Sequence, residues 1–308
     1  MIFLINLRQI LLTNFINVSI MRKLIFAVSC CTMFAACSKS SIDMPADEDW
    51  GKVPIQISTS ITRATDTAFE NGDKVGIYVA NVPNALKVSG NHADNVCHTY
   101  SGSWTAKTPI YWLDESTKAD FYCYYPYEQT ISSVEAYPFS VRANQSSEEN
   151  YKASDFLWGK TTGVAPTKNA VGITVKHAMS NIIVKLMPSN GYTPTDMAEA
   201  SVSICGLKTS STINLATGEV TATGRANDIT PKKENGQYRA LVVPQSVTDT
   251  DLIKVTVGDK TFTLNQTVDF QSGKQHTCTL KVERTNQGIN IGIGGWETDT
   301  DDFGGTVE

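Results

Sequence analysis

Short runs in which apolar and polar residues alternate dominate the chain from Val53 onward. Val53, Ile55 and Ile57 alternate with polar neighbours, and the runs 75–79 and 121–125 are β-branched or aromatic. A period of two residues is typical of half-buried β-strands. The second half repeats the pattern at residues 171–175, 182–186, 262–264 and 276–282. The chain is therefore predicted to be all-β.

Turn residues separate these runs at intervals of about ten residues, which favours antiparallel β-sandwiches. Two tight hairpins are predicted, from Ile213 to Val220 and from Ile253 to Phe262. Helix is expected to be scarce, with residues 194–200 as the best candidate because Pro194 suits a first helical turn.

A chain of 308 residues is long for one core, so two domains of ordinary size are expected. The Pro, Thr, Gly and Lys-rich stretch at residues 160–169 is the most loop-like interior segment. We therefore predict two tandem antiparallel β-sandwiches, one over residues 53–162 and the other over residues 163–308.

The first 36 residues have the pattern of a targeting segment. They contain no acidic residue, and Met21-Arg22-Lys23 precedes an apolar run that ends in Ala35-Ala36-Cys37. This order resembles a bacterial lipoprotein signal peptide, which implies a lipid on Cys37 and Met21 as the true start. The apolar run of residues 24–36 is too short to span a bilayer, although residues 1–36 together could form a longer apolar segment. Residues 37–52 are predicted to be a lipid-anchored tether.

The charge of the chain argues against nucleic acid as a partner. The full chain has a net charge of −5, and residues 1–36 hold three of its 26 basic and none of its 31 acidic side chains. The remaining 272 residues carry a net charge of −8 and offer no basic surface for nucleic acid.

A series of landmarks along the chain resembles a known family. A first strand that contains Arg63, at residues 61–65 (ITRAT), is followed by residues 69–78 (FENGDKVGIY). The motifs YYPY at 124–127, SDFLWG at 154–159 and ITVKHAMS at 173–180 come next, with Trp296 near the end. Their order is similar to that of the fimbrillin-like surface lipoproteins of Bacteroides-type bacteria.

This resemblance implies transthyretin-like sandwiches, lipid anchoring at the outer membrane and assembly into fimbriae that serve cell adhesion. It also implies cleavage between Arg63 and Ala64, so that the departing first strand exposes a groove for the strand of another subunit. The expected partners are other fimbrial subunits and host or bacterial surface ligands. Arg63 could equally be an ordinary polar residue at a strand end. The alternative function is a surface lipoprotein that captures glycans or nutrients on exposed aromatic residues.

No catalytic constellation is found, so neither an enzyme nor a cofactor is predicted. His177 and His276 lie on strand faces, which favours packing roles. The cluster His92–His98 fits no standard metal template, and residues 292–295 lack the lysine of a phosphate loop. Acidic residues at 297, 299, 301 and 308 have calcium-loop spacing without its central glycine, so a solvated tail is favoured.

Four cysteines remain after Cys37: Cys97, Cys123, Cys205 and Cys278. An exported protein could oxidise them. Cys205, however, is out of phase with its apolar neighbours, which argues against pairing with Cys278. Free thiols are therefore favoured in each predicted domain.

Overall fold

The computed structural model describes residues 49–61, 69–285 and 288–302, which belong to one compact unit, Asp49–Glu308. The predicted signal segment, Cys37, Arg63 and Ala64 lie outside the described residues. Within the described ranges, none of the helices has the length and apolar character needed to cross a membrane.

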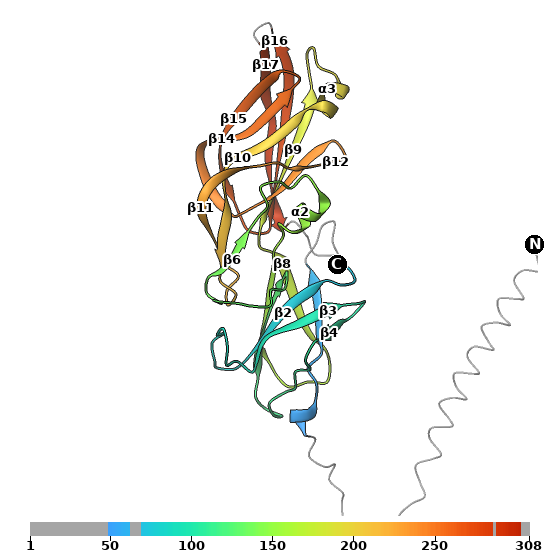
Figure 1. Ribbon diagram of the computed structural model, residues 1–308, viewed down its shortest axis with the longest axis vertical. Coiled ribbons are helices and arrows are strands. Elements are labelled where there is room, and N and C mark those ends of the chain that lie inside the picture. Colours follow the sequence, from blue (N-terminus) through green and yellow to red (C-terminus); the bar gives the residue numbers. More distant parts are fainter. Residues whose placement is uncertain (1–48, 62–68, 286–287, 303–308) are drawn as a thin grey trace, which may run out of the picture. The chain divides into compact units, whose positions relative to one another are not determined.

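The described part is built from strands, with helix confined to three short segments (Figure 1). The first group of strands is β1 (Ile57–Ile61), β2 (Lys74–Asn81), β3 (Ala93–Tyr100), β4 (Trp104–Ala106), β5 (Ala119–Tyr125), β6 (Tyr137–Ser140), β7 (Leu157–Val164) and β8 (Val171–His177). The second is β9 (Ser180–Pro188), β10 (Ser201–Ile213), β11 (Val220–Ile229), β12 (Lys232–Glu234), β13 (Gln237–Val242), β14 (Gln245–Val257), β15 (Lys260–Phe270), β16 (Lys274–Thr285) and β17 (Gly288–Asp302). The helical segments are η1 (Trp50–Lys52), α2 (Glu148–Lys152) and α3 (Pro194–Glu199). The all-β prediction is confirmed.

The first sheet has seven strands in the order β1-β8-β7-β5-β2-β3-β4. Its strands pair antiparallel except β1, which runs parallel to β8. One face carries a core that includes Val75, Ile77, Phe121 and Ile173. The opposite face carries Tyr78, Tyr122 and Tyr124, which belong to a second core.

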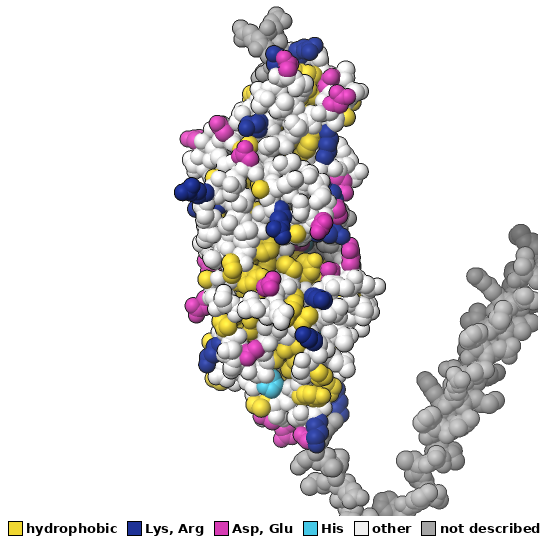
Figure 2. Space-filling view, viewed as in Figure 1, with side chains coloured by type: hydrophobic (Ala, Val, Ile, Leu, Met, Phe, Trp, Pro, Cys, Tyr) yellow, Lys and Arg dark blue, Asp and Glu magenta, His cyan; other side chains and the backbone are white. Residues whose placement is uncertain are grey.

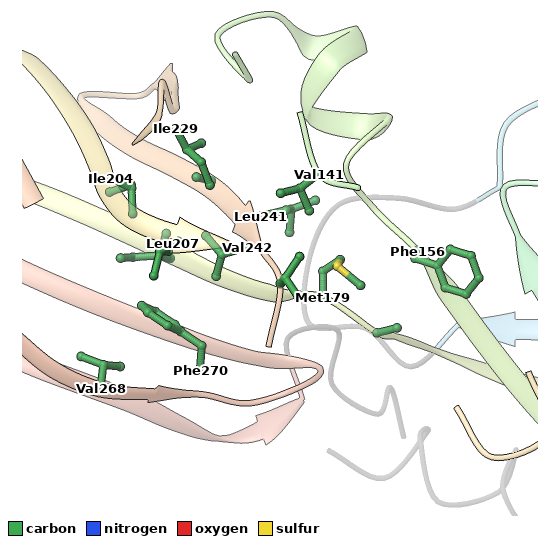
Figure 3. Packing of buried hydrophobic residues seen from close by; sticks show 14 of the residues in the cluster. Val141, Phe156, Met179, Ile204, Leu207, Ile229, Leu241, Val242, Val268 and Phe270 are labelled. Atoms are coloured by element: carbon green, nitrogen blue, oxygen red, sulfur yellow. The ribbon is translucent and has the colours of Figure 1, made fainter. Parts of the chain in front are cut away.

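Two five-stranded sheets follow. One has the order β11-β10-β14-β15, with β6 also paired to β10, and the other has the order β12-β13-β9-β16-β17. Their apolar faces form the larger core, in which Ile204 and Leu207 of β10, Phe270 of β15 and Val242 of β13 all contribute to one cluster (Figure 3). This arrangement is a β-sandwich, because side chains from two facing sheets interdigitate.

The chain changes sheets after His177. Position 163 lies inside β7, whose hairpin partner β8 belongs to the same sheet. β6 pairs with β10 of the C-terminal sandwich, although it precedes β7 and β8 in the sequence. The division into two domains stays a prediction, and the change between sheets falls 14 residues beyond the predicted boundary.

The hairpins and the helix that were predicted from turn and capping residues occur in the structure. The two predicted hairpins are β10–β11 and β14–β15. The expected helix is α3, where the Thr193 side chain and Asp196 form a capping box around a proline in the first turn. Cys97, Cys123, Cys205 and Cys278 are all buried free thiols.

Candidate functional site

The segment Val53–Ile61, called here the closing strand, completes the seven-stranded sheet. Its first half pairs antiparallel with residues 110–112 through backbone hydrogen bonds of 2.7 and 3.2 Å. Its second half is β1, which pairs in parallel with Val171–Val175 of β8. The closing strand therefore hydrogen-bonds to two segments of the sandwich and covers the core between them.

Alternate side chains of the closing strand face this core. Ile55 and Ile57 are 6% and 7% exposed, and Val53 and Ile61 are half-buried against the same cluster. The intervening positions are exposed: Pro54, Gln56, Ser58 and Ser60. This is the alternation that the sequence predicts for residues 53–57, and it continues to the end of β1.

Burial of these side chains supplies much of the energy that holds the closing strand. A fully buried isoleucine stabilises a fold by about 2 kcal/mol, so Ile55 and Ile57 together contribute about 4 kcal/mol. A domain has a total stability of only about 5–15 kcal/mol. Loss of the closing strand would also leave unpaired those amide and carbonyl groups of β8 that face β1. The vacated groove would therefore need a replacement strand.

A side chain from the opposite edge of the sheet also holds the closing strand. Trp104 lies in β4, and its indole Nε1 donates a hydrogen bond of 2.8 Å to Oγ1 of Thr59. β1 and β4 are the two ends of the seven-stranded order, so this bond links both edges of one sheet. Sequence reasoning did not identify Trp104, because its run is short and flanked by turn residues.

The chain is anchored again just after the predicted cleavage position. The ring of Phe69 packs against Trp104 with centroids 4.8 Å apart and lies 5.9 Å from the ring of Tyr125. Glu70 forms an ion pair of 2.7 Å with Lys152 of α2. Residues 62–68, which contain Arg63 and Ala64, thus connect two fixed points while lying outside the described residues.

The aromatic landmarks act mainly in packing. Tyr124 is 1% exposed, and its hydroxyl donates to Oδ1 of Asn95 at 2.7 Å. Trp158 is half-buried and donates from Nε1 to the Leu215 carbonyl at 2.8 Å. Among residues 49–61 and 69–284, whose side chains the structure describes, Tyr111 is the exposed aromatic one. Among these residues, a broad aromatic stacking surface is therefore not formed.

Exposed apolar side chains gather over the part of the molecule that contains the first sheet, on the face drawn in Figure 2. The large apolar residues that are exposed here lie in loops (Val82, Val88 and Leu113) or in the short segment paired with the closing strand (Tyr111). Met187, on β9, is a further exposed apolar residue. None of these five residues belongs to the core that the closing strand covers.

The weaker sequence candidates do not come together as sites. His92 contacts the Tyr111 carbonyl at 2.6 Å, whereas Cys97 and His98 are buried in β3. No group of three metal-ligating side chains occurs among the described residues. Residues 292–295 and the acidic positions 297–301 are part of β17, paired to β16 as a strand rather than folded as a loop.

The two strand-face histidines pack as expected. His276 is 1% exposed and contacts the ring of Phe270 edge-on at 5.1 Å. His177 is 8% exposed, and its Nδ1 lies 2.9 Å from a carboxylate oxygen of Asp155. Both side chains are thus part of the packed interior.

Residues 62–296 match the family model described as fimbrillin-like. The chain is 25% identical over 291 residues to a Bacteroides uniformis protein provisionally named fimbrium subunit Fim1C, covering 89% of this chain and 94% of that protein. A solved structure of a provisionally named cell adhesion protein from Bacteroides uniformis matches with a TM-score of 0.65 and 23% identity, over 81% of this chain and 99% of that one. A Bacteroides ovatus counterpart has a TM-score of 0.65 and 21% identity, over 83% and 98%. Both likenesses show a shared fold.

Proposed function

The chain belongs to the fimbrillin-like family, and from that premise we propose that it is a non-catalytic fimbrial subunit that serves cell adhesion. In this proposal, cleavage after Arg63 frees the closing strand, and a strand from another subunit takes its place. The relative named as a fimbrium subunit supports this class of function, because the similarity extends over nearly the whole of both chains.

The observation that carries the proposal is the seating of the closing strand. It follows an alternating pattern, covers the core of the first sandwich, and pairs with β8 as the last strand of its sheet. An extended segment with the same alternation can replace such a strand, because main-chain hydrogen bonds bind any backbone and alternate side chains fill the pockets. The predicted cut at Arg63 lies two residues beyond the end of β1.

The cleavage step is tested on a purified chain that lacks residues 1–36. An arginine-specific protease should cut after Arg63, as read by N-terminal sequencing, and the product should form oligomers in light scattering. Arg63→Ala should stay uncut at this position and monomeric. Arg225→Ala is the matched control, since Arg225 is exposed on β11, and this variant should assemble like the parent.

Two outcomes would contradict assembly. One is cleavage at Arg63 with a product that stays monomeric. The other is saturable binding of a defined polysaccharide by a chain that never self-associates, which would favour a glycan-capture lipoprotein instead.

Membrane anchoring is proposed on the signal pattern of the first 36 residues. A lipid on Cys37 would hold the uncut precursor at the outer membrane, with residues 37–52 as the predicted tether. Cys37→Ala should release the precursor into the soluble fraction, measured by membrane fractionation of expressing cells. Ser38→Ala is the control and should remain in the membrane fraction. Retention of the Cys37→Ala protein with the outer membrane would contradict the lipid anchor.

A further inference from the structure

One inward position of the closing strand differs from the rest. The residues that face the core are Val53, Ile55, Ile57, Thr59 and Ile61. Thr59 alone among them has a polar side chain, and it is half-buried. Its hydroxyl accepts the 2.8 Å hydrogen bond from Nε1 of Trp104.

Trp104 is held in place by contacts that do not involve the closing strand. Its ring packs edge-on against Phe69 and at a tilt against Tyr100, with centroid distances of 4.8 and 5.1 Å. Phe69 follows the predicted cut in the sequence, so it would stay with the body of the subunit. The indole N–H would therefore remain fixed at the wall of the groove after the closing strand leaves.

We propose that Trp104 selects the strand that enters the vacated groove. An acceptable strand carries a hydroxyl or amide oxygen at the position of Thr59, with apolar side chains at the inward positions on either side. This inference rests on the proposed function, which supplies another subunit as the source of the strand.

The selection follows from the direction of the hydrogen bond. An indole N–H can only donate, so an apolar side chain opposite Trp104 leaves this donor without a partner. Trp104 and Thr59 are both half-buried, so the loss of this partner costs the net contribution of one hydrogen bond. A strand with isoleucine or valine at every inward position would thus bind more weakly than one that offers an oxygen here.

The test uses the chain from residue 37 with residues 62–68 replaced by the recognition site of an unrelated protease. Cutting at this site does not depend on whether Arg63 is the natural processing position. Labelled nine-residue peptides of sequence 53–61 are then exchanged into the cut protein, and their affinities are measured by fluorescence anisotropy. The peptides are the parent, Thr59→Val, Thr59→Ser, and Ser58→Val as an outward-facing control.

On the parent protein, the Thr59→Val peptide should bind about tenfold more weakly than the parent peptide. Thr59→Ser and Ser58→Val should bind within about fourfold of it. On a Trp104→Phe protein the Thr59→Val peptide should bind at least as well as the parent peptide, because no donor remains to be satisfied.

Equal binding of the parent and Thr59→Val peptides to the parent protein would overturn the selection while leaving strand exchange intact. If the parent peptide itself does not enter the groove, strand exchange at this groove fails and the selection fails with it.

Discussion

Gly76 shows how a single residue can be fixed by a neighbouring strand. It lies in β2 opposite Tyr124 of β5. A Cβ atom at this position would overlap the Tyr124 ring and lie 2.7 Å from Oδ1 of Asn95. The group that approaches this glycine is the first tyrosine of the YYPY motif.

Gly76→Ala should therefore destabilise the fold by about 2–3 kcal/mol, because the buried tyrosine ring must shift. Gly172→Ala is the matched control. It also lies in a strand of the same sheet, and an added Cβ meets nothing closer than the Ser58 hydroxyl at 3.8 Å. Urea denaturation of the two variants measures the difference. Equal stabilities would contradict the packing described around Gly76.

His98 gives a pH-dependent prediction. Burial in β3 lowers the pKa of His98, because the imidazolium loses hydration, and the hydrogen bond with the Val96 carbonyl offsets this only in part. The folded pKa lies below the unfolded value of about 6.5, so the unfolded chain takes up the proton first as the pH falls. The free energy of unfolding that comes from this group is therefore lost below about pH 6.5.

His98→Phe removes that titration. The free energy of unfolding of this variant should fall less between pH 7.5 and pH 5 than that of the parent, as measured by urea denaturation across the pH series. An unchanged pH dependence would show that His98 does not contribute to acid sensitivity.

At the scale of elements, β1 alternates inward and outward side chains, but it is short. It has five residues, and its parallel partner β8 lies more than 100 positions away in sequence. Its attachment depends on the inward side chains, since its outward positions are exposed. The contribution of β1 to the free energy of unfolding is therefore expected to depend on the size of those inward side chains.

Ile57→Ala should lower the free energy of unfolding by about 2–4 kcal/mol, because it removes a 7% exposed side chain from the core. Ser58→Ala, one position away on the exposed face, should change it by less than about 0.5 kcal/mol. Chemical denaturation of the intact chain measures both. Similar effects at the two positions would mean that β1 is not seated on the core.

The elements that sequence reasoning identified are those decided locally. The alternation of residues 53–57, the two hairpins and the helix at Pro194 depend on side-chain phase, turn residues and capping, all visible within a few positions. The parallel pairing of β1 with β8 and the contact of Trp104 with Thr59 join distant segments. A single sequence does not indicate which distant segments pair with each other. The position of the closing strand along the chain was therefore predicted, but the strands and side chains that it contacts were not.

β6 illustrates the same limit. Residues 137–140 (YPFS) hold no alternation of polar and apolar residues, and they pair with Ser210–Ile213 of β10 rather than with a neighbour in sequence. The domain boundary was predicted from the loop-like composition of residues 160–169. In the structure this stretch is part of the β7–β8 hairpin.

At the scale of the whole molecule, assembly depends on whether the closing strand can leave. Ser58 of β1 and Gly172 of β8 are register partners on the exposed face. A Cβ atom on residue 172 would lie 3.8 Å from the Ser58 hydroxyl, and neighbouring strands have the spacing that a disulfide requires. The pair Ser58→Cys and Gly172→Cys should therefore lock the closing strand in place by a reversible bond.

The most direct test of strand exchange is the assembly of this locked variant after cleavage at Arg63, followed by light scattering. The oxidised protein should stay monomeric although its chain is cut, and addition of a reductant should restore assembly to the level of either single-cysteine variant. Equal assembly of the oxidised and reduced proteins would contradict the account, because subunits would then join without release of the closing strand.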